Sequence, residues 1–164
     1  MATLNVTITE ELTLNGADRG STNTLSVASV TQVYHRIVTC PASVDTTVAT
    51  FQTATSTSDN AIDLEDAKYI RVTNLDGTHP VNLSLQVAGG EDGTANMSAT
   101  ILLSAGTSFM MGATHDGIAV SDADANIVTS LTDLESILID PVGNAISVEV
   151  FIACLLYTSP SPRD

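Results

Sequence analysis

Basic and aromatic residues are scarce in this chain of 164 residues. Five Lys and Arg residues stand against 19 Asp and Glu residues, which gives a formal net charge of −14, and Trp is absent. A surface of that sign repels nucleic-acid phosphate and anionic lipid. We therefore expect no nucleic acid and no membrane among the partners of this protein.

Long apolar runs and a targeting signal are also missing. The apolar stretch Ile101–Leu103 is typical in length, far short of the roughly 20 residues that a membrane-spanning helix needs. The N-terminal Met1–Asn5 has neither a basic region nor an apolar core, so we expect no signal peptide and synthesis in the cytoplasm. Of two cysteines, Cys40 precedes Pro41 and is expected to be a reduced, buried residue.

The C-terminal residues 154–164 differ from everything before them. They read CLLYTSPSPRD, hold two of the five prolines, and end the alternation of apolar and polar residues. This string resembles the in-frame translation of a transposase adapter used in sequencing libraries. The resemblance implies that residues 154–164 are an artefact tail, that the native C-terminus beyond residue 153 is missing, and that the sequence comes from metagenomic short reads. Residues 1–153 are then predicted to form a single domain.

Period-two alternation predicts an all-β fold. It is clear in Leu4–Ile8, Val81–Val87 and Ile146–Ile152, and the abundance of Thr, Val and Ile favours strands over helices. No stretch longer than one turn has a helical period. About ten short strands at this spacing predict an antiparallel two-sheet sandwich of jelly-roll type, in which both sheets bury one apolar face.

Turn residues divide the predicted strands. Asn15–Gly20 separates the first two strands, because Asn and Gly tolerate positive φ. The strands Lys68–Thr73 and Val81–Val87 flank a segment that contains Asp-Gly, and this pattern predicts a β-hairpin. The segment Ala61–Ala67 is predicted to form one short helical turn or an acidic loop.

No catalytic pattern can be assembled from the sequence. His35, His79 and His115 lie in three different local contexts, and none has a second ligand at metal-binding spacing. A cupin-like site needs two histidines close together, a carboxylate and a further histidine. Nucleophile-elbow and phosphate-loop motifs are absent as well. We therefore predict that the protein is not an enzyme.

One short pattern could bind a cation. Asp122, Asp124 and Asn126 place oxygen ligands at alternate positions, as a Ca²⁺ loop does. The match is incomplete, because Ile127 occupies the position where a sharp turn needs Gly and Asp133 stands where the loop needs Glu. A solvated polar turn is the alternative. No other cofactor is expected.

Several segments carry a resemblance to a known class of proteins. They are Leu12–Gly16, Tyr69–Asp76, Leu103–Phe109 and Ile146–Ile152. In these segments the chain resembles small virion-associated proteins of environmental tailed phages. The resemblance implies a non-enzymatic structural protein of the virion, such as a capsid decoration or a head- or tail-associated component. It implies capsid or tail proteins as partners, a homo-oligomeric state, and no catalytic residues.

Two alternatives stay open. The first is a β-sandwich adhesion module that binds carbohydrate or Ca²⁺ through its loops. Sugar sites use aromatic platforms, whereas the aromatic residues before the tail all lie on predicted strands, where burial in the core is expected: Tyr34, Phe51, Tyr69, Phe109 and Phe151. The second is a cupin-like enzyme, which the missing histidine cluster opposes.

Overall fold

The computed structural model describes residues 1–52, 61–89, 97–120 and 127–155. These residues form thirteen strands and no helix. The strands are β1 (Ala2–Glu10), β2 (Thr13–Leu14), β3 (Ala17–Asp18), β4 (Ser21–Val30), β5 (Gln32–Cys40), β6 (Thr46–Gln52), β7 (Ile62–Asp63), β8 (Ala67–Asn74), β9 (Val81–Val87), β10 (Met97–Leu103), β11 (Ser108–Met111), β12 (Leu134–Pro141) and β13 (Ile146–Cys154). No described helix has the length and apolar character to span a membrane.

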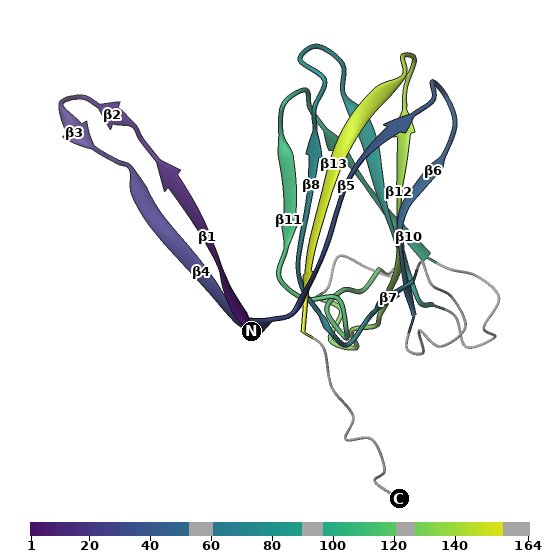
Figure 1. The fold of residues 1–164 in the computed structure, drawn as a ribbon. Helices are drawn as coiled ribbons and strands as arrows, with labels where there is room; N and C mark the ends of the chain where they lie inside the picture. The colour runs from purple at the N-terminus through teal and green to yellow at the C-terminus, as the bar shows by residue number, and fades with distance from the viewer. Residues whose placement is uncertain (53–60, 90–96, 121–126, 156–164) are drawn as a thin grey trace, which may run out of the picture.

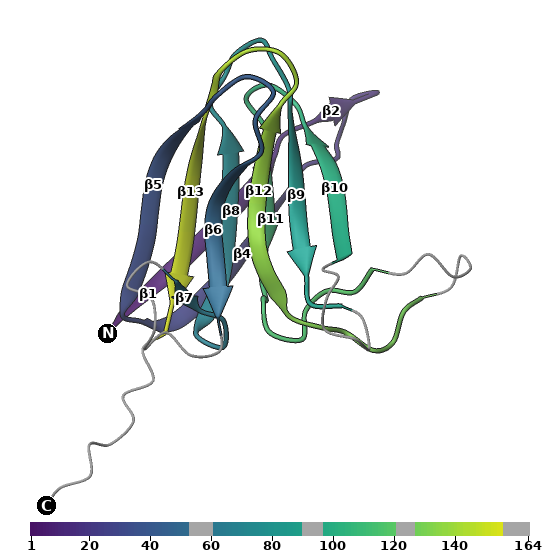
Figure 2. The ribbon, with the colours of Figure 1, turned by 90° about the vertical axis from the view of Figure 1, so that its right-hand side faces the viewer.

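Two sheets pack face to face, as the sequence predicted (Figure 1). One has the order β11-β8-β13-β5, and the other has the order β10-β9-β12-β6 with the two-residue strand β7 added in parallel to β6. The two sheets contain eight strands besides the short β7, namely β5, β6 and β8 to β13. When these eight are numbered 1 to 8 along the chain, the two sheet orders become 6-3-8-1 and 5-4-7-2. This is the strand order of a jelly roll, and Figure 2 shows the second sheet in front.

The core lies between the sheets and consists of the apolar residues of each alternating strand. In β9 and β13, Val81, Leu83, Val148 and Val150 are fully buried, while their neighbours in sequence are only partly covered. Burial of one such side chain contributes about 1.5–3 kcal/mol. The inward orientation of β9, which the sandwich prediction required, is confirmed.

The prediction that β8 and β9 form a hairpin is wrong. The two strands belong to different sheets, and the segment between them crosses from one layer to the other. Gly77 lacks the positive φ that a tight Asp-Gly hairpin turn needs. The carboxylate of Asp76 instead accepts hydrogen bonds from the backbone N–H groups of Thr78 and His79, both at 2.7 Å. These bonds favour a wider loop, and the apolar faces of both strands point into one core.

Hydrogen bonds of the buried Asn74 side chain stabilise the segment that crosses from β8 to β9. Its side-chain amide donates to the carbonyl oxygens of His79 at 2.8 Å and of Leu103 and Ser104 at 3.3 Å each. Its side-chain oxygen accepts from the backbone N–H of Asp76 at 3.0 Å. One side chain thus ties the β8–β9 crossing to the end of β10.

Other local predictions meet the structure with small differences. The predicted short helical turn or acidic loop at 61–67 contains the two-residue strand β7 and then a turn. Strand β13 continues to Cys154, one residue past the predicted domain boundary, and Cys154 is buried and paired with Ala67 and Gln32. Strand β6 ends at Gln52, the last residue of the first described segment.

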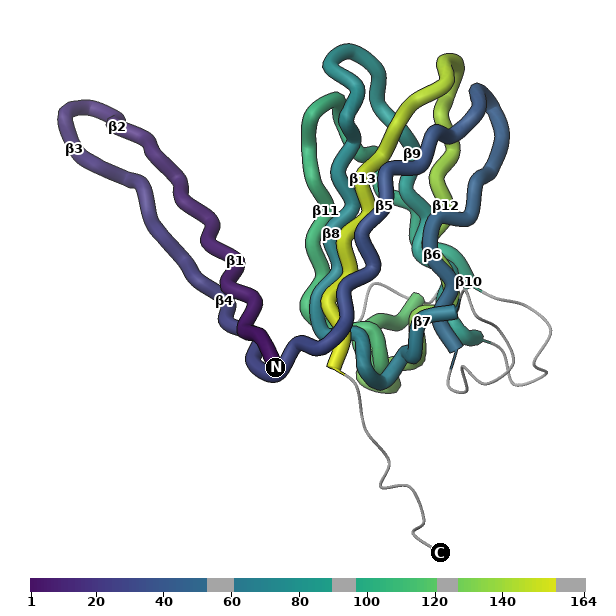
Figure 3. Tube along the Cα trace, in the orientation of Figure 1, coloured from purple at the N-terminus to yellow at the C-terminus, as the bar shows by residue number. Residues whose placement is uncertain are grey.

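Strands β1 and β4 form a long antiparallel hairpin that projects away from the sandwich; we call residues 2–30 the arm (Figures 1 and 3). Its tip is the small β2–β3 hairpin, where Asn15 and Gly16 both adopt positive φ, as the sequence predicted for this turn. At the root, the pairing register shifts between Ala2 and Leu4, and Ser29 has a φ of 62°. A bulge of this kind bends a strand and turns the arm away from the sheet. From the sequence, both strands were predicted to lie within the sandwich.

Candidate functional site

The three histidines lie far apart in the fold. His35 is on the outer face of β5, His79 is in the β8–β9 crossing beside Asp76, and His115 lies in the loop after β11. The described interior of the jelly roll is lined mainly by aliphatic side chains, with Phe51, Cys40 and Cys154 among them. A cupin-like reading requires histidines directed into that interior, and none of the three is.

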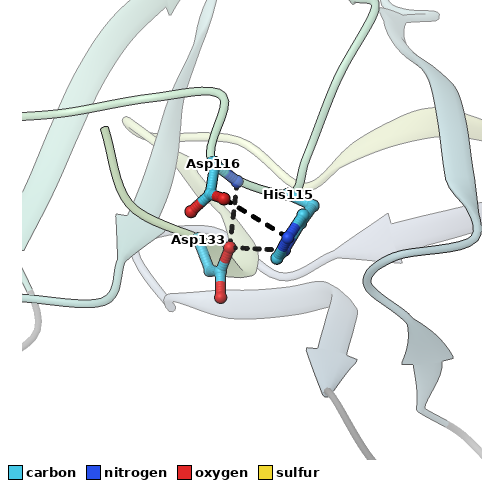
Figure 4. Close-up of side chains that lie close together, drawn as sticks. All are labelled: His115, Asp116 and Asp133. Carbon is cyan, nitrogen blue, oxygen red and sulfur yellow. Dashed lines mark hydrogen bonds and ion pairs between the residues drawn. The ribbon is translucent and has the colours of Figure 1, made fainter. Parts of the chain in front are cut away.

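Two carboxylates that the sequence pattern did not link to His115 lie beside its ring (Figure 4). Its Nδ1 atom lies 3.0 Å from Asp133 Oδ1, and its Nε2 atom lies 3.3 Å from Asp116 Oδ2. Asp133 also accepts a hydrogen bond from the backbone N–H of Asp116 at 2.9 Å. The bridge between Ile118 and Thr132 closes the loop and brings Asp133 to His115.

This cluster has the composition of a partial metal site. One ligand atom from each residue lies within 4.8 Å of the others, and both His115 and Asp116 are exposed. A mixed set of imidazole and carboxylate ligands suits Zn²⁺ or Mn²⁺, with water to complete the coordination. In the structure the two carboxylates contact opposite ring nitrogens, so an ion on one nitrogen requires one carboxylate to move. The side chains are already satisfied without an ion.

The predicted Ca²⁺ ligands Asp122, Asp124 and Asn126 lie outside the described residues. The Ca²⁺ site therefore stays a prediction. Asp133, the residue at the twelfth position of the same pattern, contacts His115 in the described part of the structure.

Both cysteines are free and buried, as predicted for Cys40. Burial raises the pKa of the Cys40 thiol above its usual value. Burial, and then the nearby carboxylates of Asp66 and Asp63, raise the pKa of Cys154 to about 11. Because the thiolate is the reactive form, neither residue is suited to nucleophilic chemistry at neutral pH.

The outer face of the β11-β8-β13-β5 sheet carries a small ionic network. Glu149 on β13 accepts from Arg71 on β8 and contacts His35 on β5, each at 2.7 Å. The hydrogen bond from Arg71, followed by the one to His35, lowers the pKa of the Glu149 carboxyl. Thr73 and Ser108 lie in the same row as Glu149 and bond to each other at 2.8 Å. This part of the face is polar and internally satisfied.

The root of the arm covers a different, apolar part of the same face. Leu4, Val6 and Val27 of the arm pack with Tyr69 and Phe151 of the sheet in a second hydrophobic cluster, which also holds Val30 and Ala153. Tyr69 is buried, as the sequence predicted, and Phe151 is partly buried, but both point to the outer side of the sheet and are covered by the arm. The Tyr69 and Phe151 rings meet edge to face with 6.3 Å between their centroids.

Above its root the arm separates from the sheet and leaves an open wedge. Two pockets of about 310 and 500 Å³ lie in it, both lined by Val6, Ile8, Tyr69 and Met110. Leu25 is 45% exposed and Ile8 is 44% exposed. The row of apolar side chains on the arm therefore continues past the residues that pack against the sheet, and its outer members are exposed. The alternation of β1 was readable from the sequence, but the separation of the arm was not.

Comparisons with known proteins give little further information. No family model matches the chain, and no curated protein matches it. One solved structure, from work on Bacillus endospore appendages described as a novel family of disulfide-linked pili, is 17% identical and covers 80% of this chain and 98% of its own. Its TM-score of 0.36 is too low to indicate a shared fold.

Proposed function

We propose that this protein is a non-enzymatic structural subunit of a virus particle, a capsid decoration or a head- or tail-associated component of a tailed phage. The observation that carries the proposal is the arm, a hairpin that leaves the sandwich and keeps apolar side chains uncovered. Exposed apolar surface of this kind marks contacts with other proteins. The site therefore supports assembly rather than chemistry on a small molecule.

Two further features support the same function. Jelly rolls are a recurrent architecture of viral capsid domains, although lectin domains and cupins share it, so the fold alone does not decide. The described interior is filled by aliphatic side chains such as Leu83, Ile137 and Val150, which leaves the loops and the arm as contact surfaces. The resemblance of the sequence to small phage virion proteins points to the same class.

The proposal is tested in purified particles. Phage particles from the source community are banded on a density gradient, and their proteins are digested and identified by mass spectrometry. Peptides of this chain are expected in the same fractions as capsid and tail peptides, in several copies per particle. Their absence from particle fractions, with the protein found free in the lysate, would refute a virion role.

A second candidate function is cation binding at the loop end of the sandwich. The cluster of His115, Asp116 and Asp133 favours it, and the predicted ligands Asp122 and Asp124 lie in the neighbouring segment. Calorimetric titration with Zn²⁺ and with Ca²⁺ separates the two sets. His115→Ala is expected to abolish heat from Zn²⁺, and Asp122→Ala is expected to abolish heat from Ca²⁺. Wild-type protein that gives no heat with either ion excludes this function.

A further inference from the structure

We propose that the wedge between the arm and the sandwich receives the arm of a second copy, so that two arms clasp through their apolar faces. The proposal rests on the proposed function, since it names the surface through which the subunits assemble. The contact between the two arms is nevertheless separate from the presence of the protein in the particle. The protein can belong to the particle even if its arms do not clasp.

The arm has two chemically distinct faces. Opposite residues in the β1–β4 ladder share a face, and the pairs Leu4–Val27 and Val6–Leu25 make one face apolar near the root, where Ile8–Asn23 and then Glu10–Ser21 follow. The other face is polar and bonded across the strands: Ser26 donates to Asn5 at 2.6 Å, and Thr7 bonds to Thr24 at 3.2 Å. The apolar face points toward the wedge, and its outer part is left without a cover by the sandwich.

The sheet of the same chain is a poor cover for that outer part. The apolar patch around Tyr69 and Phe151 is already used by the root of the arm. The next row of the sheet holds Thr73 and Glu149, which are bonded within the sheet. Closure of the arm onto its own sheet would bring Ile8 and Leu25 only to the short strip of Tyr69, Met110 and Met111 that lines the wedge, beside these polar groups.

The arm of a second copy can contact the first arm with one face and the sheet of the first copy with the other. In a two-fold arrangement each arm lies between the partner's arm and the partner's sheet. The two apolar faces then meet in the middle, and each polar Asn/Thr/Ser face lies on the polar row of the other chain's sheet. Two-fold contacts of this kind are the commonest in homo-oligomers, because one self-complementary surface suffices.

Charge favours a partner of the same sequence at this place. The chain has a formal net charge of −14, so two copies repel each other over most of their surfaces. Residues 2–9 and 21–30, which make up β1 and β4 apart from Glu10, contain no Asp, Glu, Lys or Arg, whereas the outer end of the arm holds Glu10, Glu11, Asp18 and Arg19. Identical copies can therefore approach along the long strands β1 and β4 with little repulsion, and the charged residues of the arm lie toward its tip.

The area of the clasp is sufficient for a stable contact. From Ala2 to the turn at Asn15 the arm is about 45 Å long, at about 3.3 Å per residue, and its two strands are about 10 Å wide. An overlap of the outer two thirds covers about 300 Å² on each face. Both faces of both arms and the two sheet surfaces then bury about 1,800 Å², within the range of about 1,200–2,000 Å² for stable interfaces.

Mass in solution tests the clasp with full-length protein. Wild type is expected to sediment as a dimer or as a multiple of it. Ile8→Glu and Leu25→Glu place a charge on the apolar face and are expected to raise the dissociation constant at least about a hundredfold. The matched control is Leu102→Glu, an exposed apolar residue on β10 of the other sheet, which is expected to leave the mass unchanged. Far-ultraviolet circular dichroism checks that each variant is folded.

Cross-linking provides a second measurement that does not depend on a disruptive charge. A Leu25→Cys variant treated with a short bismaleimide is expected to give a covalent dimer, whereas Leu102→Cys is not. Three results overturn the clasp: monomeric wild type, glutamate variants of Ile8 and Leu25 that remain oligomeric, or equal cross-linking of both cysteine variants. If the chain is nevertheless found in purified particles, the proposed function survives and only the clasp is wrong.

Discussion

Replacement of Asn74 by Asp changes one buried group without a change in shape. In the wild type the amide donates to three carbonyl oxygens, and the side-chain oxygen accepts from the N–H of Asp76. In Asn74→Asp a carboxyl oxygen takes the place of the amide nitrogen and faces the same three acceptors. Asn74→Ala is the matched control, because it removes the hydrogen bonds and introduces no charge.

The size of the effect follows from the contacts. Loss of the partners of buried polar groups costs about 1–3 kcal/mol for each group left unsatisfied, so Asn74→Ala is expected to lose about 2–4 kcal/mol. The carboxyl of Asn74→Asp can donate to one of the carbonyls only when it is protonated. Burial and the three facing carbonyls therefore raise its pKa, and each unit above the unfolded value costs about 1.4 kcal/mol at neutral pH.

The sign of the pH dependence separates the two variants. Between the unfolded pKa of about 3.9 and its raised folded pKa, the new carboxyl binds more protons in the folded state. Relative to wild type, Asn74→Asp is therefore expected to lose stability as the pH rises from 4 to 7, while Asn74→Ala keeps a constant difference. Denaturation in guanidinium chloride at both pH values measures this. A loss below about 1 kcal/mol at pH 7, or parallel behaviour of the variants, would refute the assigned role of Asn74.

Three further predictions concern the core, the ionic network and the thiols. Leu83→Ala is expected to lower the free energy of unfolding by about 2–5 kcal/mol in denaturant titration, and a loss below about 1 kcal/mol would contradict its burial. Glu149→Gln removes the ion pair with Arg71 and is expected to cost less than about 1 kcal/mol at pH 7; because the folded pKa of Glu149 is lowered, the difference should fade as the pH falls below 4.5, and a difference that grows there would be contrary evidence. Iodoacetamide at pH 8 is expected to label Cys40 and Cys154 only after unfolding, since burial raises the pKa of both thiols, and rapid labelling of native protein would rule this out.

Much of the sandwich was predictable because one physical rule governs it. A residue in a strand points to the side opposite its neighbours, so the alternation in Val81–Val87 and Ile146–Ile152 located both the strands and their buried faces. The turn at Asn15 and Gly16 was predictable for a similar local reason, since both residues tolerate positive φ. These features depend on neighbours in the sequence.

Features set by distant residues were missed. Asp-Gly at 76–77 is a strong local signal for a hairpin, but the hydrogen bonds of Asn74 and the shared core place β8 and β9 in different sheets. The approach of Asp133 to His115 depends on a bridge between residues 14 apart, 118 and 132. Strand β1 alternates as regularly as any core strand, so its pattern gave no sign that it leaves the sandwich with β4. A period-two pattern predicts that one face of a strand is buried, but it does not identify the element that buries it.

A single residue, Thr31, separates the arm from β5, and its backbone N–H donates to the carbonyl of Cys154 at 3.1 Å. So short a joint, bonded to the last strand, leaves the hairpin little freedom to swing. In an array of copies joined through their arms, the fixed angle at residue 31 would set the distance and the tilt between neighbouring sandwiches. The curvature of any shell or tube built from this chain would then be encoded in the backbone angles of residues 29–31.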